Sequence, residues 1–237
     1  MKRFADLCIR PLLDNKNEID QMTKLSKILG ISLVGIVFER NHSQNLIDKI
    51  IMKFNKKGID VAKRLDLIPR NRIELLKDLR KYRGEYEIIS VKCINTEVSI
   101  VAARDRRVDL ITICKEMSLR NRRRAISRIS NKTLEIKISE ILDTSKPRIV
   151  VFKRLNEEIF FAKTNKIPIV ISSGAKDSFM MRSPRDMAAL GIFLGLEESE
   201  AIKSVSKIPF NIVETNREKL SSKWISDGVK IVRVQKK

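Results

Sequence analysis

Residues 167–194 read IPIVISSGAKDSFMMRSPRDMAALGIFL and contain one complete strand, loop and helix. The apolar run ends in Ser172-Ser173-Gly174, which predicts a strand over Pro168–Ser172 and then a turn. Ser183-Pro184-Arg185-Asp186 has a serine N-cap followed by proline, the pattern of a helix start. We therefore predict a helix over Pro184–Leu194. This strand–helix unit decides the fold, because units of the same kind recur along the whole chain.

Apolar runs alternate with helical patterns from one end of the sequence to the other. Further strands are predicted over residues 4–9, 32–38, 59–67, 87–93, 108–114 and 133–138. Helices are predicted over residues 18–29, 43–57, 72–82, 96–103, 119–129, 145–165 and 197–207, with a helical piece at 217–224 and a short strand at 229–234. Strands this rich in Val, Ile and Leu indicate a parallel sheet covered by helices. We predict an α/β fold with one TIM-barrel-like (β/α) barrel domain over residues 1–237, and a doubly wound open sheet as the alternative.

The composition points to a polyanionic partner. The chain has 49 Lys and Arg against 29 Asp and Glu, a formal net charge of +20. No apolar run approaches the roughly 20 residues of a membrane span, and the N-terminus lacks a signal-peptide pattern, so we expect a cytoplasmic protein without a membrane partner. Cys8, Cys93 and Cys114 are widely spaced, which predicts buried thiols, with a shared metal as the alternative.

The usual catalytic signatures are missing from the sequence. It has one histidine, His42, and no GxGxxG, GxxxxGK[ST] or GxSxG motif. In a barrel, functional side chains gather at the C-terminal ends of the strands. Those ends carry a basic and hydroxylic rim that is poor in carboxylates: Arg10, Glu39, Arg40, Lys92, Lys115, Ser139, Ser172 and Ser173. Asp6 fits a hydrogen-bond acceptor better than a lone acid–base group. We therefore predict no catalytic residue and no metal ligand in this chain.

A basic cluster covers residues 101–130, which contain nine Arg and Lys and three acids. Most of the cations are arginines, whose planar fork suits bidentate phosphate contacts. Aromatic residues do not interleave with them, so we expect contacts to the phosphates of a folded RNA rather than base stacking. The expected RNA-binding residues here are Arg104, Arg106, Arg107, Lys115, Arg122, Arg123 and Arg124. A solvated helix face is the alternative.

The opening stretch supplies the remaining candidate RNA-binding residues. The turn at Gly174 and the free N–H groups of the following helix start could hold a phosphate. Lys176, Arg182 and Arg185 would supply countercharge, which a purely structural turn does not require. Ser172 and Ser173 could donate hydrogen bonds at the strand end, or they could simply form the turn.

Several stretches together resemble one family. The strand ending ISSGA and the following MRSPRDMAALG and FLGL are similar to the C-terminal signature of ribonuclease P protein component 3, the thirty-kilodalton subunit of archaea and eukaryotes. FADLCIR, RRVDLITI and TLEIKIS lie in the order that this family has. The resemblance covers nearly the whole chain, and the block from Ser172 to Leu196 is its most specific part.

The resemblance implies a fold related to the polymerase and histidinol phosphatase-like hydrolases, with the metal site lost. Asp6-Leu7-Cys8-Ile9 stands where those hydrolases carry a paired-histidine motif. It implies a non-catalytic subunit of ribonuclease P, the endoribonuclease that removes the 5′ leader of precursor tRNA, with the RNA performing the Mg²⁺-dependent cleavage. Implied partners are that RNA, a small ferredoxin-like subunit in a heterotetramer, and other ribonuclease P proteins. Basic residues implicated in activation match Arg182 and the Arg104–Arg107 group.

Two rival functions remain open. One is a metal-dependent phosphoesterase or nuclease on the same barrel, against which the single histidine speaks. The other is a general basic RNA chaperone, which would bind unrelated structured RNAs equally well.

Overall fold

A computed structural model describes residues 3–129, 132–143, 147–226 and 229–230. Seven parallel strands form one sheet whose order follows the sequence. They are β1 (Phe4–Ile9), β2 (Ile31–Val37), β3 (Asp60–Leu67), β4 (Ile88–Cys93), β5 (Leu110–Ile113), β6 (Thr133–Lys137) and β7 (Ile169–Ser172). The helices are α1 (Lys16–Ile28), α2 (Gln44–Asn55), α3 (Arg72–Tyr82), α4 (Thr96–Arg104), α5 (Leu119–Ile126), α6 (Ser139–Leu142), α7 (Arg148–Thr164), α8 (Pro184–Phe193), α9 (Glu198–Ser204) and α10 (Lys207–Leu220).

The sheet curls into a nearly closed barrel. Ile9 at the end of β1 forms a parallel bridge to Ala175, just beyond β7, and the Arg10 N–H donates to the Ala175 carbonyl at 2.7 Å. At the other end of the seam, the Ala5 N–H donates to the Val205 carbonyl at 2.9 Å, between α9 and α10. The expected TIM-barrel-like fold is confirmed, and the doubly wound alternative is wrong, because the strand order never reverses.

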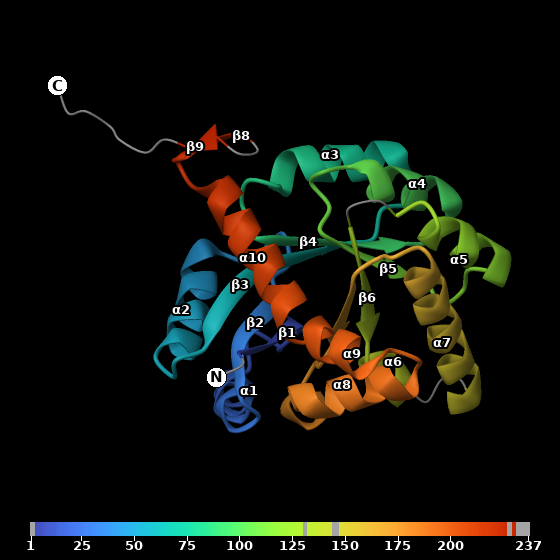
Figure 1. Cartoon of the computed structure of the whole chain (residues 1–237). Coiled ribbons are helices and arrows are strands. Elements are labelled where there is room, and N and C mark those ends of the chain that lie inside the picture. The colour runs from blue at the N-terminus through green and yellow to red at the C-terminus, as the bar shows by residue number, and fades with distance from the viewer. Residues whose placement is uncertain (1–2, 130–131, 144–146, 227–228, 231–237) are drawn as a thin grey trace.

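Helix α10 closes the N-terminal end of the barrel. Apolar side chains from six strands point inward there and pack against Phe210 and Val213 of α10: Ala5, Leu7, Leu33, Ala62, Ile88, Leu110 and Val170. Figure 1 shows α10 crossing in front of the strands while the other helices surround them. The larger core lies between the strands and those surrounding helices. This double burial explains why the strands are almost continuously apolar.

Gly35 in β2 allows β1 to approach closely inside the barrel. A Cβ at this position would lie 2.2 Å from the Leu7 carbonyl oxygen, which no side chain tolerates. Strand β1 is also irregular in its pairing with β2 between Asp6 and Ile9. The Leu7 carbonyl is thereby free to face the interior, where it accepts a hydrogen bond from Arg64.

Polar N-caps start most helices directly after the preceding strand or loop. Each cap accepts from the N–H three residues later, at Asn15, Ser43, Asn71, Asn95, Ser118 and Ser183. The predicted cap at Ser183 is confirmed, with 3.1 Å to the Asp186 nitrogen. None of the helices in the described ranges is long and apolar enough to span a membrane.

The C-terminal part differs most from the sequence prediction. Helices were predicted over residues 197–207 and 217–224, but α10 occupies most of the gap between these ranges. Its first turn contains Pro209, which is tolerated there because an N–H group in the first turn has no partner within the helix. Of the strand predicted over residues 229–234, residues 229–230 form a strand and the remainder lies outside the described residues. The strand at residues 229–230 pairs antiparallel with β8 (Trp224–Ser226) and does not join the barrel. Helix α6 was not predicted.

Candidate nucleic-acid interface

A buried ionic network fills the barrel above its apolar layer. Arg64 and Asp66 of β3 lie two residues apart and so share the inner face, as do Glu135 and Lys137 of β6. The Arg64 guanidinium donates to both carboxylate oxygens of Glu135 at 2.5 and 2.6 Å, and to Asp66 at 2.6 Å. Lys137 Nζ lies 3.1 Å from Asp66, and the Ser172 hydroxyl donates to Glu135 at 2.8 Å. The network thus spans three strands.

The cations of this network keep both carboxyls ionised. Burial by itself raises the pKa of Asp66, but Arg64, Lys137 and Arg10 lower it well below its ordinary value. Burial likewise raises the pKa of Glu135, and Arg64 and Lys137 bring it below the ordinary value. Each carboxylate is therefore neutralised by guanidinium and ammonium groups of the protein itself. Among the described residues, no three His, Cys, Asp and Glu side chains are grouped so that they could hold a metal ion.

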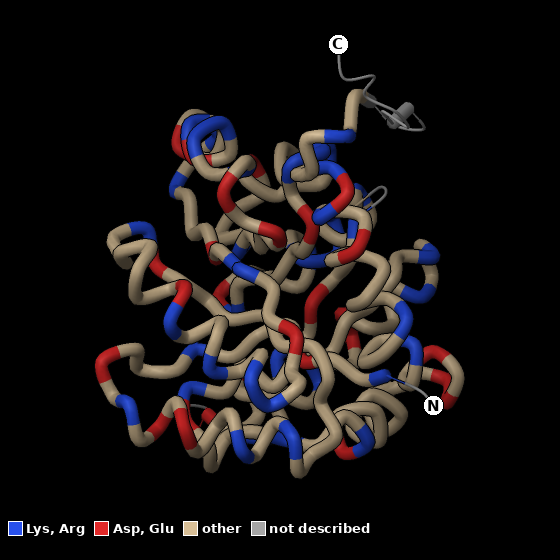
Figure 2. The backbone as a smooth tube through the Cα atoms, turned by 90° about the vertical axis from the view of Figure 1, so that its left-hand side faces the viewer, with Lys and Arg blue, Asp and Glu red and all other residues tan. Residues whose placement is uncertain are grey.

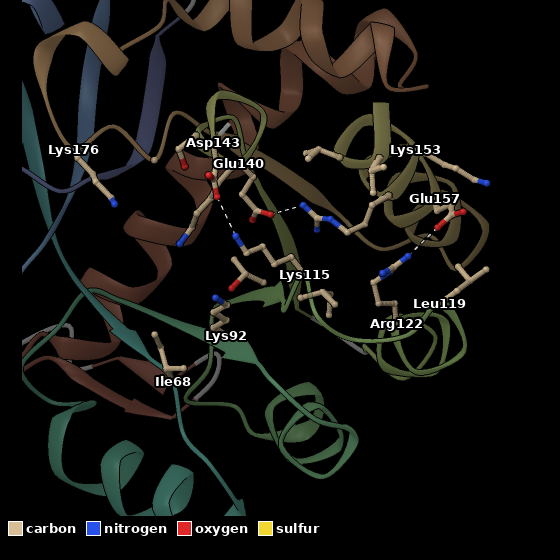
Figure 3. A pocket seen from close by; sticks show the side chains of 18 of the residues that line it. Ile68, Lys92, Lys115, Leu119, Arg122, Glu140, Asp143, Lys153, Glu157 and Lys176 are labelled. Atoms are coloured by element: carbon tan, nitrogen blue, oxygen red, sulfur yellow. Dashed lines mark hydrogen bonds and ion pairs between the residues drawn. The ribbon is translucent and has the colours of Figure 1, made fainter. Parts of the chain in front are cut away.

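A pocket of about 450 Å³ opens over this network, at the C-terminal ends of β4 to β7 (Figure 3). Its walls come from the strand ends, α5, α6 and α7. The cations that line it are Arg10, Lys92, Lys115, Arg122, Lys137, Lys153, Arg154 and Lys176, and the acids are Glu140, Asp143 and Glu157. The predicted basic rim is therefore present at Arg10, Lys92, Lys115 and Ser139, all of which line this pocket.

The pocket keeps an excess of positive charge after its ion pairs are counted. Each lining acid is matched by a lining cation: Lys115 lies 3.0 Å from Asp143, Arg122 lies 3.0 Å from Glu157, and Arg154 contacts Glu140. Arg10 and Lys137 pair with Asp66 below. Lys92, Lys153 and Lys176 form no ion pair with any acid in the described part of the chain.

Outside the pocket, cations are interspersed with acids. Figure 2 shows lysines and arginines at every level of the molecule, with Asp and Glu between them. Arg123 and Arg124 are exposed on α5, and Arg123 lies over the Phe161 ring at 5.7 Å. Of the candidate RNA-binding residues, the pocket brings together Lys115, Arg122 and Lys176. The first two are also engaged in ion pairs within the protein.

The arginines before β5 lie at the opposite end of the barrel. Arg104 ends α4, and Arg106 and Arg107 lie in the connection from α4 to β5, at the end of the barrel that α10 covers. Arg106 lines a shallow groove beside α10, together with Lys132 and Lys219. Arg107 is held by Asp105, at 2.9 and 2.7 Å. The basic cluster of residues 101–130 is therefore divided between two faces of the molecule.

Arg182 and Arg185 flank the start of α8. Arg182 donates to the carbonyls of Phe179 and Met181, both at 2.7 Å, and so stabilises the turn before the helix. Arg185 is exposed in the first helical turn. Asp186 already places a carboxylate at this helix start, where its oxygen accepts from the Ser183 hydroxyl at 2.7 Å. A phosphate at this position would compete with that carboxylate.

Ser172 and Ser173 lie at the end of β7, as predicted, but their side chains do not reach the surface. Both are fully buried, so neither side chain can contact an RNA. Ser172 donates to Glu135, and the Ser173 N–H donates to Asp6 at 3.0 Å. The turn-forming alternative describes them better, because both hydroxyls form hydrogen bonds inside the protein, with Glu135 and the Cys8 carbonyl. Asp6 acts as the expected hydrogen-bond acceptor. Burial raises its pKa to about 6, although the hydrogen bonds from Ser173 and Cys8 lower it in part.

Sequence reasoning missed the inner ionic network and part of the pocket. Lys137, Lys153 and Arg154 were not singled out, although all three line the pocket. The signal for Arg64, Asp66, Glu135 and Lys137 was present as charges at alternate positions in strands predicted to be buried. Cys8 and Cys93 are fully buried and Cys114 nearly so, and all three are free thiols.

Comparisons with known proteins agree on one family. A family model described as "RNase P subunit p30" matches residues 3–221. Ribonuclease P protein component 3 of Methanosarcina barkeri is 26% identical over 219 residues, covering 91% of this chain and 90% of the relative. The Methanosarcina mazei protein of the same name is 24% identical over 233 residues, covering 97% and 95%.

A solved structure shows the same fold. One chain of the cryo-EM structure of an archaeal ribonuclease P with mature tRNA superposes with a TM-score of 0.80 at 18% identity, covering 98% of this chain and all of that one. The family match spans the barrel strands, the pocket and the block that begins at Ser172. The chain therefore belongs to the RNase P subunit p30 family and is a protein subunit of ribonuclease P.

Proposed function

We propose that this chain supports the active fold of the ribonuclease P RNA by placing cations against its phosphates. The RNA, with Mg²⁺, would perform the cleavage that removes the 5′ leader of precursor tRNA, and this chain would bind no cofactor. The observation that carries the proposal is the net charge of +20 on a member of this family. The fold match to a ribonuclease P solved with mature tRNA supports it further.

The proposed RNA contacts are the candidates whose side chains reach solvent. Arg104, Arg106, Arg123, Arg124, Lys176 and Arg185 are exposed and form the main set. Arg107, Lys115, Arg122 and Arg182 are partly engaged within the protein and form a second set. Because each protein–phosphate ion pair releases counterions from the RNA, removing one of these cations should reduce the magnitude of the log–log salt slope by about 0.7 to 0.9.

The proposal extends to the assembly and its place in the cell. We propose a small ferredoxin-like subunit as the direct protein partner, in a heterotetramer that joins the RNA and other ribonuclease P proteins. We also propose that the chain acts as one domain and in the cytoplasm. The resemblance to the family suggests the small partner and the assembly, and the single seven-stranded sheet supports one domain.

The rival nuclease function would need open metal ligands at the barrel mouth. The carboxylates of the floor, Asp66 and Glu135, are instead bound by Arg64 and Lys137. The three acids that line the pocket are each paired with a cation as well. A divalent cation would have to displace these groups and would meet a positively charged pocket above them. This arrangement favours RNA support over metal-dependent hydrolysis by the chain itself.

The test is cleavage of precursor tRNA by the ribonuclease P RNA at limiting Mg²⁺, with this protein and its small partner. Wild type is compared with the double variant Arg123→Ala/Arg124→Ala. Lys56→Ala/Lys57→Ala is the matched control, because it removes two exposed charges outside the proposed contacts. We expect strong stimulation by wild type and the control, and weaker stimulation with a shallower salt slope for the arginine variant.

Two outcomes would overturn the proposal. Metal-dependent cleavage by the protein without RNA would make the chain a nuclease in its own right. Equal binding to unrelated structured RNAs, with no stimulation of cleavage, would make it a general RNA chaperone.

A further inference from the structure

We propose that the pocket at the C-terminal end of the barrel binds one phosphorylated nucleotide, either free or at the end of an RNA strand. The phosphate would lie toward Lys92 and Lys176, and the sugar and base toward Leu119 and Val150. This goes beyond the proposed function, which concerns phosphates of folded RNA, although Lys115, Arg122 and Lys176 belong both to that set of contacts and to the pocket.

The charge of the pocket is suited to a phosphate. Its three lining acids are each paired with a lining cation, which leaves Lys92, Lys153 and Lys176 without an ion pair in the described residues. On the floor, Arg64, Lys137 and Arg10 pair with Asp66 and Glu135. An anion that enters the pocket would therefore balance charge that the protein leaves unbalanced.

The floor of the pocket consists of charged side chains that are largely buried. The Lys137 side chain is only 13% exposed, and its Nζ lies 3.1 Å from Asp66 and 3.5 Å from Glu135. Burial lowers the pKa of Lys137, but the attraction of Asp66 and Glu135 more than offsets this and raises it overall. The ammonium stays charged and fixed under the pocket. A phosphate above it would thus meet a preorganised positive floor.

The shape of the pocket selects a single nucleotide. Its volume of about 450 Å³ falls within the roughly 300–1,000 Å³ of small-molecule sites. A double helix is far too wide to enter a recess of this size between the strand ends and α7. A free nucleotide or an unpaired terminal nucleotide can enter it, because either presents one phosphate and one base.

Apolar side chains are part of the pocket as well. Ile68, Ile113, Leu119, Val150 and Val151 contribute to the lining. Leu119 is 47% exposed and Val150 52% exposed, so their side chains are open to a ligand. In Figure 3, Lys92 and Lys176 reach into the pocket on one side, while Leu119 lies on the other beside the Arg122–Glu157 pair. This division matches a nucleotide, which has an anionic end and a flat, weakly polar end.

The binding test uses the full-length protein and isothermal titration with AMP, adenosine and inorganic phosphate. Variants are Lys92→Ala, Lys176→Ala and Leu119→Ala, with Lys57→Ala as the matched control, an exposed lysine away from the pocket. We expect AMP to bind, adenosine to bind at least about tenfold more weakly, and each lysine variant to weaken AMP by about tenfold. Leu119→Ala should weaken AMP but leave inorganic phosphate unchanged.

Short RNA oligonucleotides distinguish the two sources of the nucleotide. Single strands with a 5′-phosphate, a 3′-phosphate or hydroxyls at both ends compete with AMP. Tighter competition by one phosphorylated strand would assign the pocket to an RNA end, and tighter binding of AMP than of any strand would assign it to a free nucleotide. Both results support the site.

Three results would overturn it. These are no AMP binding at millimolar concentration, AMP binding that is insensitive to Lys92→Ala and Lys176→Ala, and AMP binding that is equally sensitive to Lys57→Ala. Thermal unfolding of each variant checks that the protein is folded, and Lys92→Gln replaces Lys92→Ala where the latter is unstable. Failure here would leave the stimulation of the RNA by Arg123 and Arg124 untouched, so the two proposals fail separately.

Discussion

Arg64 of β3 and Glu135 of β6 form a bidentate ion pair in the interior of the barrel, 71 residues apart in the sequence. Neither side chain has any exposure to solvent. Arg64 also donates to Asp66 and to the Leu7 carbonyl, so a single guanidinium ties together β1, β3 and β6. The strands around it depend on this group to neutralise two buried carboxylates.

Loss of Arg64 should therefore strongly destabilise the protein. Arg64→Met leaves Glu135 and Asp66 under-compensated in the interior, and breaking a buried pair in this way costs about 3–5 kcal/mol. Urea unfolding measures the change. The double variant Arg64→Met/Glu135→Leu should recover much of the stability, because it also removes the buried Glu135 carboxylate that has lost its partner. A single variant as stable as wild type would contradict this role.

Gly35 should not tolerate alanine. The added Cβ would meet the Leu7 carbonyl oxygen at 2.2 Å, and the backbone of β1 cannot retreat without disturbing the network. We expect Gly35→Ala to lower the free energy of unfolding by about 1–3 kcal/mol or more. Gly84→Ala is the control, since nothing lies within 4 Å of its Cβ position. Equal effects of the two substitutions would show that the close approach is unimportant.

Asp6 should make stability fall as the pH rises from about 4 to about 6. Burial raises its pKa in the folded protein from the ordinary 3.8 to about 6, so in this window the folded state holds a proton that the unfolded state has released. Each pKa unit corresponds to about 1.4 kcal/mol, so the total cost is on the order of 3 kcal/mol.

Asp6→Asn should remove this pH dependence. The amide oxygen can still accept from the Cys8 and Ser173 N–H groups, and the side chain does not ionise. The difference in the free energy of unfolding between variant and wild type should shift in favour of the variant as the pH rises from 4 to 7. Urea unfolding at several pH values measures this difference. A constant difference across that range would contradict the raised pKa.

Ser172 should affect stability and not RNA binding. Ser172→Ala removes the hydroxyl that donates to the Glu135 carboxylate, and hydrogen bonds to charged groups contribute about 1.5–3 kcal/mol. The salt slope of RNA binding should not change, because the side chain is buried. A shallower slope in a protein of unchanged stability would instead place this serine against RNA.

The sequence alone determined the local elements and the rim at the strand ends. Alternating apolar runs and helical patterns predicted all seven barrel strands, because periodicity and turn residues act over a few neighbours. Ser183 was predicted as an N-cap for the same reason. Arg10, Lys92 and Lys115 were placed together from the fold class, since parallel strands bring their C-terminal ends to one face.

Only the tertiary structure decided which way side chains point and which of them meet. Arg104–Arg107 and Lys115 flank the same strand, yet they lie at opposite ends of the barrel. Ser172 ends its strand facing Glu135, because each successive strand residue alternates between the two faces of the sheet. The pairing of Arg64 with Glu135 depends on the stagger of strands distant in sequence. Local patterns contain no information about that stagger, which is set when the whole barrel packs around one interior.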